Sequence, residues 1–257
     1  MPYAFVKKGY KIPAVGVVQK LLNRAGSSLT VDGDFGSHTK AAVVKFQQDR
    51  GLGSDGIVGR STFPRLVCGE RGMRVIDLVD IYDPSLANLE ARDVRNAGGT
   101  AITIGGMSNG VEQAVSDVLA SVTGGSVFLL RIHGHGAPGV AGISDGHGVP
   151  GEHGTSINID NMSYAGPLLA QLRPIFSPYG CIQFMHCSTG GGQAGQALLD
   201  SVAMWTGVPT TGAVHDQSGG GLDTFAYEGS TRTSVPGFGH LKPWCESRPD
   251  FVGMSVP

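Results

Sequence analysis

The spacing of apolar residues along the chain changes near residue 70. In the segments 14–26 and 37–50, apolar residues recur at intervals of three and four, which is the spacing of one face of an α-helix. The first segment stops at Gly26, and the second begins at Ser37, whose hydroxyl can cap a helix. We therefore expect residues 1–68 to form a small all-α module of three helices.

Beyond residue 100 the pattern alternates between two periods. Short runs rich in β-branched and aromatic residues are separated by longer runs with helical spacing, which is typical of a mostly parallel sheet covered by helices on both faces. The expected strands are 100–106, 126–134, 181–187 and 208–216, and the expected helices are 110–122, 164–176 and 193–207. We assign residues 100–257 to this three-layer α/β domain. Residues 69–99 are expected to be a linker or the start of the domain, and residues from about 229 to 257 an irregular tail packed over the sheet.

Composition and charge exclude several classes of protein. Charged residues make up 16% of the chain and the net charge is −2, which is too little charge for a disordered polymer. Uncharged apolar runs such as 126–130 are far shorter than the roughly 20 residues of a membrane span, so no membrane partner is expected. Residues 1–70 hold ten Lys and Arg against five Asp and Glu, so this part carries +5 and the remainder −7. The asymmetry favours two modules with different partners, the first suited to an anionic polymer such as a cell wall or a nucleic acid, unless its lysines are simply scattered.

The N-terminal residues and the cysteines bear on the cellular compartment. Residues 1–15 contain neither an uninterrupted apolar segment nor a small-residue cleavage site, so we expect no secretory signal. Export by another route, or a cytoplasmic stage before delivery, is then expected. The cysteines are widely spaced in a chain too long to depend on disulfides, and free thiols are expected at Cys68, Cys181, Cys187 and Cys245.

An internal repeat marks the first module. Residues 31–39, VDGDFGSHT, and residues 54–62, SDGIVGRST, share the motif D-G-x-x-G-x-x-T, in which Asp-Gly is typical of a tight turn. With VVQKLLN before them and KAAVVKFQQ between them, these segments resemble the peptidoglycan-binding domain found beside many bacterial cell-wall hydrolases. The resemblance implies binding to peptidoglycan rather than to nucleic acid, in a groove between helices, with Asp32, Phe35 and Asp55 as candidate binding residues. The two aspartates can equally be structural residues of their turns.

Two expected strands end in residues that suit nucleophilic catalysis. Strand 126–134 runs into His133 and His135, and strand 181–187 runs into His186 and Cys187. If the two strands are neighbours, an imidazole and a thiol meet at the carboxyl edge of the sheet, where ligands bind in such folds. A glycine-rich turn and a helix follow Cys187, and the N-terminal amides of a helix favour the thiolate that acts as nucleophile.

The alternation of side chains along a strand selects among the histidines. His186 and Cys187 are consecutive, so they point to opposite faces. His135 lies further out than His133 and precedes Gly136, where the backbone can approach a substrate. We expect Cys187 to be the nucleophile, His135 the general base and acid, and the N–H of Gly136, with that of Cys187, to hold an oxyanion. A cysteine can also be a small buried apolar residue with no catalytic role.

The order of these motifs carries a second resemblance. A strand followed by His-Gly, and later a strand followed by Cys, resembles the clan of cysteine peptidases that includes caspases, legumain, clostripain and separase. The segments HGHGAPG, INIDNMSYAGPLLAQL and 185–214 are more closely similar to an uncharacterised bacterial caspase-like family. The resemblance covers residues from about 100 to 216 and implies a caspase-like fold with a His-Cys dyad formed by His135 and Cys187. Gly134 stands where many relatives have Ser, and this difference concerns the local packing and leaves the dyad intact.

Three alternatives remain open. His133 and His135 have a spacing found in zinc sites, and further candidate ligands follow in the next loop: Asp145, His147, Glu152 and His153. Such a site would give a zinc-dependent hydrolase of peptidoglycan peptides. The run 187–195 opens a helix as a phosphate cradle does, but it lacks the Gly-Lys-Ser/Thr ending. The second module can also be a scaffold without catalytic activity.

These observations favour a two-module bacterial hydrolase of amide bonds, located in the cell envelope or secreted, with no cofactor and no metal. We expect a polypeptide substrate in preference to wall peptides, because wall-directed Cys-His enzymes of the papain-like type place Cys before His. In this chain the order is reversed.

Overall fold

The chain forms two compact units, one of residues 1–73 with 246–257 and the other of residues 74–245. A computed structural model describes residues 6–59, 61–68, 74–97, 99–105, 109–144, 155–221, 224–237 and 239–248. The predicted class, a small all-α module followed by an α/β domain with a mostly parallel sheet, is confirmed.

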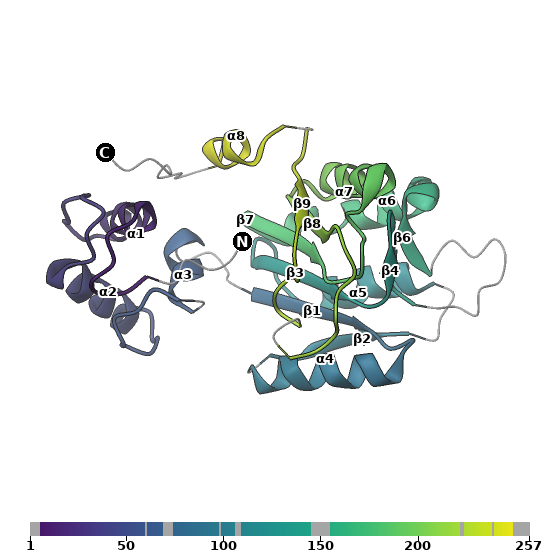
Figure 1. Ribbon diagram of the computed structural model, residues 1–257, viewed down its shortest axis with the longest axis horizontal. Coiled ribbons are helices and arrows are strands. Elements are labelled where there is room, and N and C mark those ends of the chain that lie inside the picture. Colours follow the sequence, from purple (N-terminus) through teal and green to yellow (C-terminus); the bar gives the residue numbers. More distant parts are fainter. Residues whose placement is uncertain are drawn as a thin grey trace. The chain divides into compact units, whose positions relative to one another are not determined.

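The first unit is built from three helices, α1 (Pro13–Arg24), α2 (Ser37–Asp49) and α3 (Thr62–Cys68) (Figure 1). Apolar residues of α1 and α2 pack around Phe35, which lies in the turn between them and is completely buried. Ser37 does not cap α2: it is the first residue of the helix, and the capping position is taken by Gly36 without a side-chain bond. The expectation of a serine cap was therefore wrong.

In each copy of the repeat, a buried glutamine outside the motif forms hydrogen bonds to the Asp and Thr of the motif. Gln19 of α1 donates from Nε2 to Asp32 Oδ1 at 2.7 Å and to Thr39 Oγ1 at 3.2 Å. Gln47 of α2 repeats this arrangement, and its partners are Asp55, Thr62 and the N–H of Gly56. Both glutamine side chains are 1% exposed, and a buried amide needs hydrogen-bond partners. The Asp, Gly and Thr of the motif supply them.

The second unit is organised around a six-stranded sheet with the strand order β2-β1-β3-β7-β8-β9. The strands are β1 (Arg74–Asp80), β2 (Ala101–Ile104), β3 (Val127–His133), β7 (Phe176–Phe184), β8 (Thr210–Ala213) and β9 (Thr231–Ser234). All neighbouring pairs are parallel except β8 and β9. The central pair is β3 and β7, so the two strands expected to carry the candidate dyad are neighbours.

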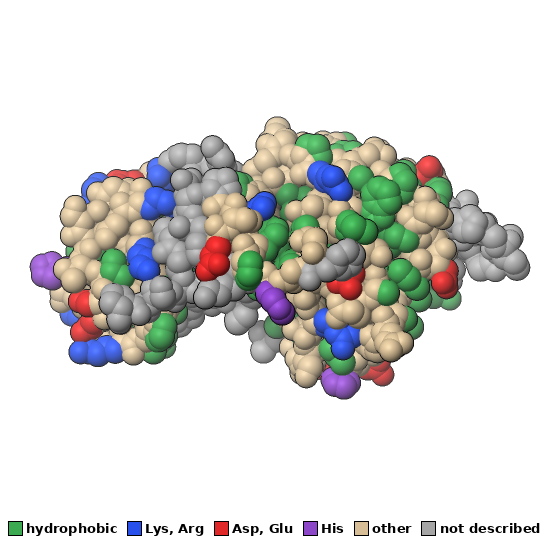
Figure 2. All heavy atoms as spheres, turned by 90° about the horizontal axis from the view of Figure 1, so that it is seen from above, with side chains coloured by type: hydrophobic (Ala, Val, Ile, Leu, Met, Phe, Trp, Pro, Cys, Tyr) green, Lys and Arg blue, Asp and Glu red, His purple; other side chains and the backbone are tan. Residues whose placement is uncertain are grey.

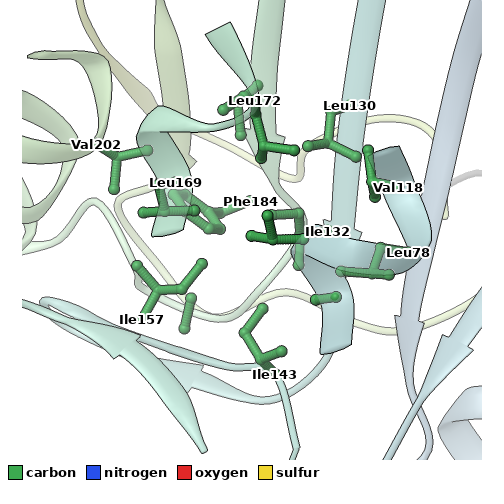
Figure 3. Close-up of a cluster of buried hydrophobic side chains, with 14 of the residues drawn as sticks. Leu78, Val118, Leu130, Ile132, Ile143, Ile157, Leu169, Leu172, Phe184 and Val202 are labelled. Atoms are coloured by element: carbon green, nitrogen blue, oxygen red, sulfur yellow. The ribbon is translucent and has the colours of Figure 1, made fainter. Parts of the chain in front are cut away.

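One face of the sheet forms the apolar core. Helices α5 (Gly110–Ser121), α6 (Met162–Ala170) and α7 (Gly192–Thr206) pack on it. A small antiparallel sheet of β4 (Gly136–Ala137), β5 (Val140–Gly142) and β6 (Ser156–Asn158) adds Ile143 and Ile157 to the same cluster (Figure 3). Two 3₁₀ turns, η1 (Ile159–Asn161) and η2 (Arg173–Ile175), flank α6.

The opposite face is covered by α4 (Pro84–Asn96) and by the chain between β8 and β9. We call residues 214–230 the strap; positions 222 and 223 lie outside the described residues. In Figure 1 the strap crosses in front of β3 and β1 toward α4. Alternate residues of β1 and β3 point to this face, among them Asp77, Arg131 and His133.

The structure corrects two segment assignments. Residues 74–96 contain β1 and α4, so the sheet begins at Arg74 and not at residue 100. The segment from 229 is not wholly irregular, because it contains edge strand β9 and a short helix, α8 (Leu241–Glu246).

The described surface refines two inferences from composition. No helix among the described residues has the length and apolar character needed to cross a membrane. On the face shown in Figure 2, the Lys and Arg side chains of the first unit are scattered among neutral ones and do not form a single stripe.

Candidate active site

The carboxyl ends of β1, β3, β7 and β8 lie along one edge of the sheet because these strands are parallel. β3 ends at His133 and leads into His135, and β7 ends at Phe184 and leads into Cys187. β1 leads into Asp83, and β8 leads into the strap. The site is built from the residues that follow these four strands.

His135 lies at the surface and contacts the N-terminus of α4. Its Nε2 is 3.2 Å from Asp83 Oδ2, and the two side chains are 55% and 39% exposed. Asp83 also caps α4, because its side chain accepts hydrogen bonds from the N–H groups of Ser85 and Leu86. These amide bonds, that of Leu86 first, and the contact with His135 hold the pKa of Asp83 below its usual value.

The thiol of Cys187 contacts the backbone of the strap. Its Sγ lies 3.3 Å from the N–H of Gln217, which donates to it, and 3.3 Å from the carbonyl oxygen of Gln217, to which a protonated thiol donates. Gln217 is itself fixed by reciprocal bonds with the backbone of Glu228. The sulfur is half-buried and free of any disulfide, as are those of Cys181 and Cys245. These three cysteines therefore form no disulfide, as the sequence predicted, and the side chain of Cys68 lies outside the described residues.

The loops that carry His135 and Cys187 are packed against one another. A Cβ atom placed on Gly136 would lie 2.7 Å from Cβ of His186 and 2.8 Å from Oγ1 of Thr189. Only glycine fits there, because carbon atoms do not approach so closely. The two candidate side chains nonetheless have different hydrogen-bond partners: Asp83 for His135, and Gln217 for Cys187.

His186 connects the loop that follows β7 to the segment that follows β3. Burial lowers the pKa of its ring to about 4, so the ring is neutral at pH 7. Its Nε2 donates to the carbonyl oxygen of Gly142 at 2.8 Å, and the N–H of Gly142 donates to the carbonyl oxygen of His135 at 3.0 Å. His186 therefore supports the backbone of His135 through Gly142.

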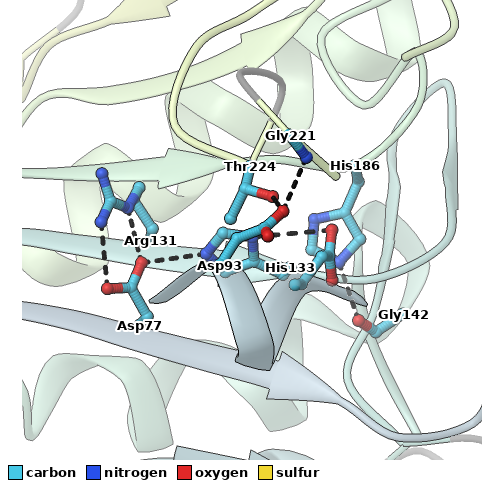
Figure 4. A network of polar contacts seen from close by, with 9 residues as sticks. Asp77, Asp93, Arg131, His133, Gly142, His186, Gly221 and Thr224 are labelled. Atoms are coloured by element: carbon cyan, nitrogen blue, oxygen red, sulfur yellow. Dashed lines mark hydrogen bonds and ion pairs between the residues drawn. The ribbon is translucent and has the colours of Figure 1, made fainter. Parts of the chain in front are cut away.

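A buried charge network lies behind the site, on the face covered by α4 (Figure 4). Arg131 donates to Asp77 from Nε at 2.6 Å and from Nη2 at 3.0 Å. His133 Nε2 is 3.0 Å from Asp77 Oδ1, and its Nδ1 is 3.7 Å from Glu90 Oε1 of α4. Burial opposes charge on Asp77 and on His133, but the hydrogen bonds outweigh it. The pKa of Asp77 is lowered and that of His133 is raised.

The strap is anchored to the same helix. Asp93 of α4 accepts hydrogen bonds from the N–H of Gly221 at 2.6 Å and from Oγ1 of Thr224 at 3.1 Å. The guanidinium of Arg131 lies 4.8 Å from the centre of the Phe225 ring, a cation–π distance. Helix α4 is thus in contact with His135 at its first turn and with the strap near its last.

The described residues test only the part of the metal alternative that concerns His133 and His135. His133 is completely buried beside Asp77, whereas His135 is exposed beside Asp83, so the two rings have separate surroundings. Among the described residues no three His, Cys, Asp or Glu side chains are placed to hold a metal ion. The other candidate ligands lie outside the described residues: Asp145, His147, Glu152 and His153.

Close packing of the backbone explains the glycines in residues 187–195. A Cβ atom on Gly195 would lie 2.3 Å from the carbonyl carbon of Gly190, so the first turn of α7 packs directly on the preceding turn. Arg232 of β9 donates to the carbonyl oxygens of Gly190 and Gly192 at 2.7 and 2.6 Å. These contacts account for the glycines without a phosphate.

The three candidate binding residues of the first module have structural surroundings. Asp32 and Asp55 each accept hydrogen bonds from a buried glutamine and from the amide two residues further along the chain. Phe35 is 0% exposed, so its ring lies in the core and contributes no surface to a ligand. The candidate contact through Phe35 is corrected on this ground.

Sequence reasoning missed Asp83, because β1 and α4 were not recognised. The signal was present: Asp83-Pro84 places a capping residue before a proline in the first turn of a helix.

Comparisons with known proteins concern a limited part of the chain. Residues 11–66 match the family described as "Putative peptidoglycan binding domain". The zinc D-Ala-D-Ala carboxypeptidase of Streptomyces albus G is 51% identical over 41 residues, which is 16% of each chain. A peptidoglycan-binding protein from Clostridioides difficile, solved with glutamine hydroxamate, is 38% identical over 25% of this chain and 40% of that chain, with a TM-score of 0.25. The endolysin of Burkholderia AP3 phage is 32% identical over 35% of this chain and 33% of that chain, with a TM-score of 0.26.

The chain therefore spans less than half the length of each of these proteins. The family match falls within the three-helix unit and includes both glutamine-closed repeats. Residues 11–66 are a peptidoglycan-binding domain, joined in this chain to an α/β module.

Proposed function

We propose that the α/β module is a cysteine-type hydrolase with a caspase-like fold, which the first module attaches to peptidoglycan. Cys187 is the nucleophile, His135 is the general base and acid, and the N–H of Gly136 stabilises the oxyanion. The bond cleaved is an amide, and the place of action is the bacterial cell envelope.

The adjacency of β3 and β7 carries this proposal. The two strands are parallel neighbours in the middle of the sheet, so His135 and Cys187 follow their ends at the same edge. The close packing of Gly136 on His186 supports the same placement. A mostly parallel sheet whose central strands deliver first a His-Gly pair and then a Cys agrees with the resemblance to the caspase clan. The scaffold alternative does not require this arrangement.

The backbone of Gly136 is suited to hold an oxyanion. The N–H of Gly142 donates to the carbonyl oxygen of His135, and Gly136 pairs with Ala141 next along the ladder. In an antiparallel ladder such pairs alternate between bonded and non-bonded. The N–H of Gly136 therefore points away from β5, toward the outside of the hairpin.

The reaction follows the usual course of thiol-dependent amide hydrolysis. The proton of the Cys187 thiol passes to the ring of His135, and the sulfur attacks the carbonyl carbon. The ring then gives this proton to the leaving amine as the C–N bond breaks. Water, deprotonated by the same ring, hydrolyses the acyl-enzyme and restores the thiol. Catalytic hydrogen bonds commonly shorten only when substrate binds, which is consistent with the separate partners of His135 and Cys187 in the free chain.

A polypeptide is the proposed substrate in preference to the peptides of the wall. The order of His before Cys along the chain favours this choice, as does the likeness to the caspase clan. The rim beside Asp83 presents exposed apolar side chains, Ile81 at 43% and Tyr82 at 57%, which suit contact with an extended peptide.

Alkylation of the full chain by iodoacetamide tests the dyad. We expect Cys187 to react faster than Cys181 and Cys245, and to lose this advantage in His135→Ala. Mass spectrometry of tryptic peptides gives the rate at each thiol, and Cys181 is the internal control because it is also half-buried. Equal rates at all thiols, unchanged by the substitution, would favour a scaffold. Binding to isolated sacculi is expected to survive deletion of residues 74–257.

A further inference from the structure

The carboxylate of Asp83 is fixed by one group of contacts and directed at His135 by another. Its Oδ1 accepts from the N–H of Ser85 at 2.9 Å and from the N–H of Leu86 at 3.2 Å. Its Oδ2 is 3.2 Å from Nε2 of His135. Because the amides hold one oxygen, the other has little freedom to turn away from the ring.

We propose that Asp83 is a positioning residue for His135, which rests on the proposed function above. A carboxylate only accepts hydrogen bonds, so Nε2 of His135 carries the proton that faces Asp83. Nδ1 is then the nitrogen that receives the thiol proton. The ring becomes positively charged in that step, and the carboxylate at Nε2 stabilises the charge.

Helix α4 connects this contact to two others. Two turns beyond Asp83, Glu90 lies 3.7 Å from Nδ1 of His133 on β3. Further along, Asp93 binds Gly221 and Thr224 of the strap, and the strap contacts Cys187 through Gln217. The helix therefore fixes Asp83 relative to the strand that carries His135 and to the segment that touches the nucleophile.

The substitution Asp83→Asn separates the capping of α4 from the contact with His135. Asn caps helices about as well as Asp, so α4 is expected to keep its stability, while the negative charge beside His135 is lost. We expect the rate of alkylation of Cys187 at pH 7 to fall about tenfold, the scale of one charge-assisted hydrogen bond, with an altered pH profile. Asp117→Asn is the matched control, because Asp117 lies on α5 on the other face of the sheet and bonds to Gln113. It is expected to change neither the rate nor the profile.

A second readout does not depend on reactivity. The pKa of Asp83 is lowered by the amides of Leu86 and Ser85 and by His135. Removal of the ring in His135→Ala is therefore expected to raise the pH at which Asp83 titrates, followed by NMR of its carboxyl carbon in the full chain. Thermal unfolding shows whether Asp83→Asn has retained the fold.

The outcomes separate this inference from the proposed function. A slower Cys187 in Asp83→Asn, with an unchanged Tm and a raised Asp83 titration in His135→Ala, supports the positioning role. If His135→Ala slows Cys187 and Asp83→Asn does not, the positioning role is overturned and the proposed dyad stands. If neither substitution affects Cys187, both are overturned.

Discussion

Removal of the carboxylate at Asp77 is expected to destabilise the α/β module strongly. Asp77 accepts two hydrogen bonds from Arg131, at 2.6 and 3.0 Å, and the two side chains are 6% and 9% exposed. Asp77→Asn keeps the shape of the side chain and removes its charge. The guanidinium of Arg131 is then buried without its counter-ion.

The expected loss follows from this burial. Two unit charges about 4 Å apart attract by about 4 kcal/mol at an effective dielectric constant of about 20, and breaking a buried pair costs about 3–5 kcal/mol. A domain of this size is stable by roughly 5–15 kcal/mol, so the variant is expected to fold. At about 2–4 °C per kcal/mol, its Tm is expected to fall by roughly 6–20 °C.

Calorimetry of the full chain measures this change, and hydrogen exchange of residues 127–133 assigns the transition to the α/β module. The double substitution Asp77→Leu with Arg131→Met is the control. It removes both charges, and such replacements are often neutral or stabilising. A fall in Tm of less than about 3 °C for Asp77→Asn, or a double variant less stable than Asp77→Asn, would refute the reasoning.

Three further predictions concern pH, the repeat and the glycine-rich turn. The pKa of His133 is raised in the folded chain, so its stabilising contribution is complete below about pH 6.5, the pKa of an unfolded histidine, and is lost as the pH rises through the folded pKa. The pKa of Asp77 is lowered, so Asp77 stabilises the fold above about pH 4 and loses this contribution in more acidic solution. Urea unfolding of wild type across pH 3–9 is expected to show both losses, and a stability independent of pH above 6.5 would contradict the assignment. Gln47→Leu leaves several buried hydrogen-bond partners unsatisfied and is expected to destabilise the first module by about 3 kcal/mol. Gln48→Leu, at the exposed neighbouring position, is expected to have little effect. Equal urea midpoints for the two variants would contradict a stabilising role of Gln47. Gly195→Ala forces a Cβ atom to within 2.3 Å of the backbone and is expected to cost about 1–3 kcal/mol, measured as a lower Tm of the α/β module.

Local pattern determined the elements whose faces differ in polarity. The helices of the first module and the motif D-G-x-x-G-x-x-T were readable, because helix periodicity and turn chemistry depend on neighbouring residues. The alternation of strands and helices beyond residue 100 gave the parallel sheet. It also placed His135 and Cys187 after strands. Because parallel strands have their carboxyl ends at one edge of the sheet, both residues were expected at that edge.

β1 was missed because Asp77 and Asp80 interrupt its apolar run. An aspartate in the middle of a strand reads as a loop residue, and its burial is acceptable only because Arg131 and His133 neutralise it from positions 54 and 56 residues away. Because β1 and α4 were not predicted, Asp83, which lies between them, was not identified as a candidate residue.

The sequence by itself determined the two modules, the α/β class and the pair of strand ends. Only the tertiary structure decided that Phe35 is core, that His133 is buried while His135 is exposed, and that Asp83 faces the latter. The physical reason is that periodicity reports which face of an element a side chain occupies, whereas its partners are set by strand register and helix packing between distant segments.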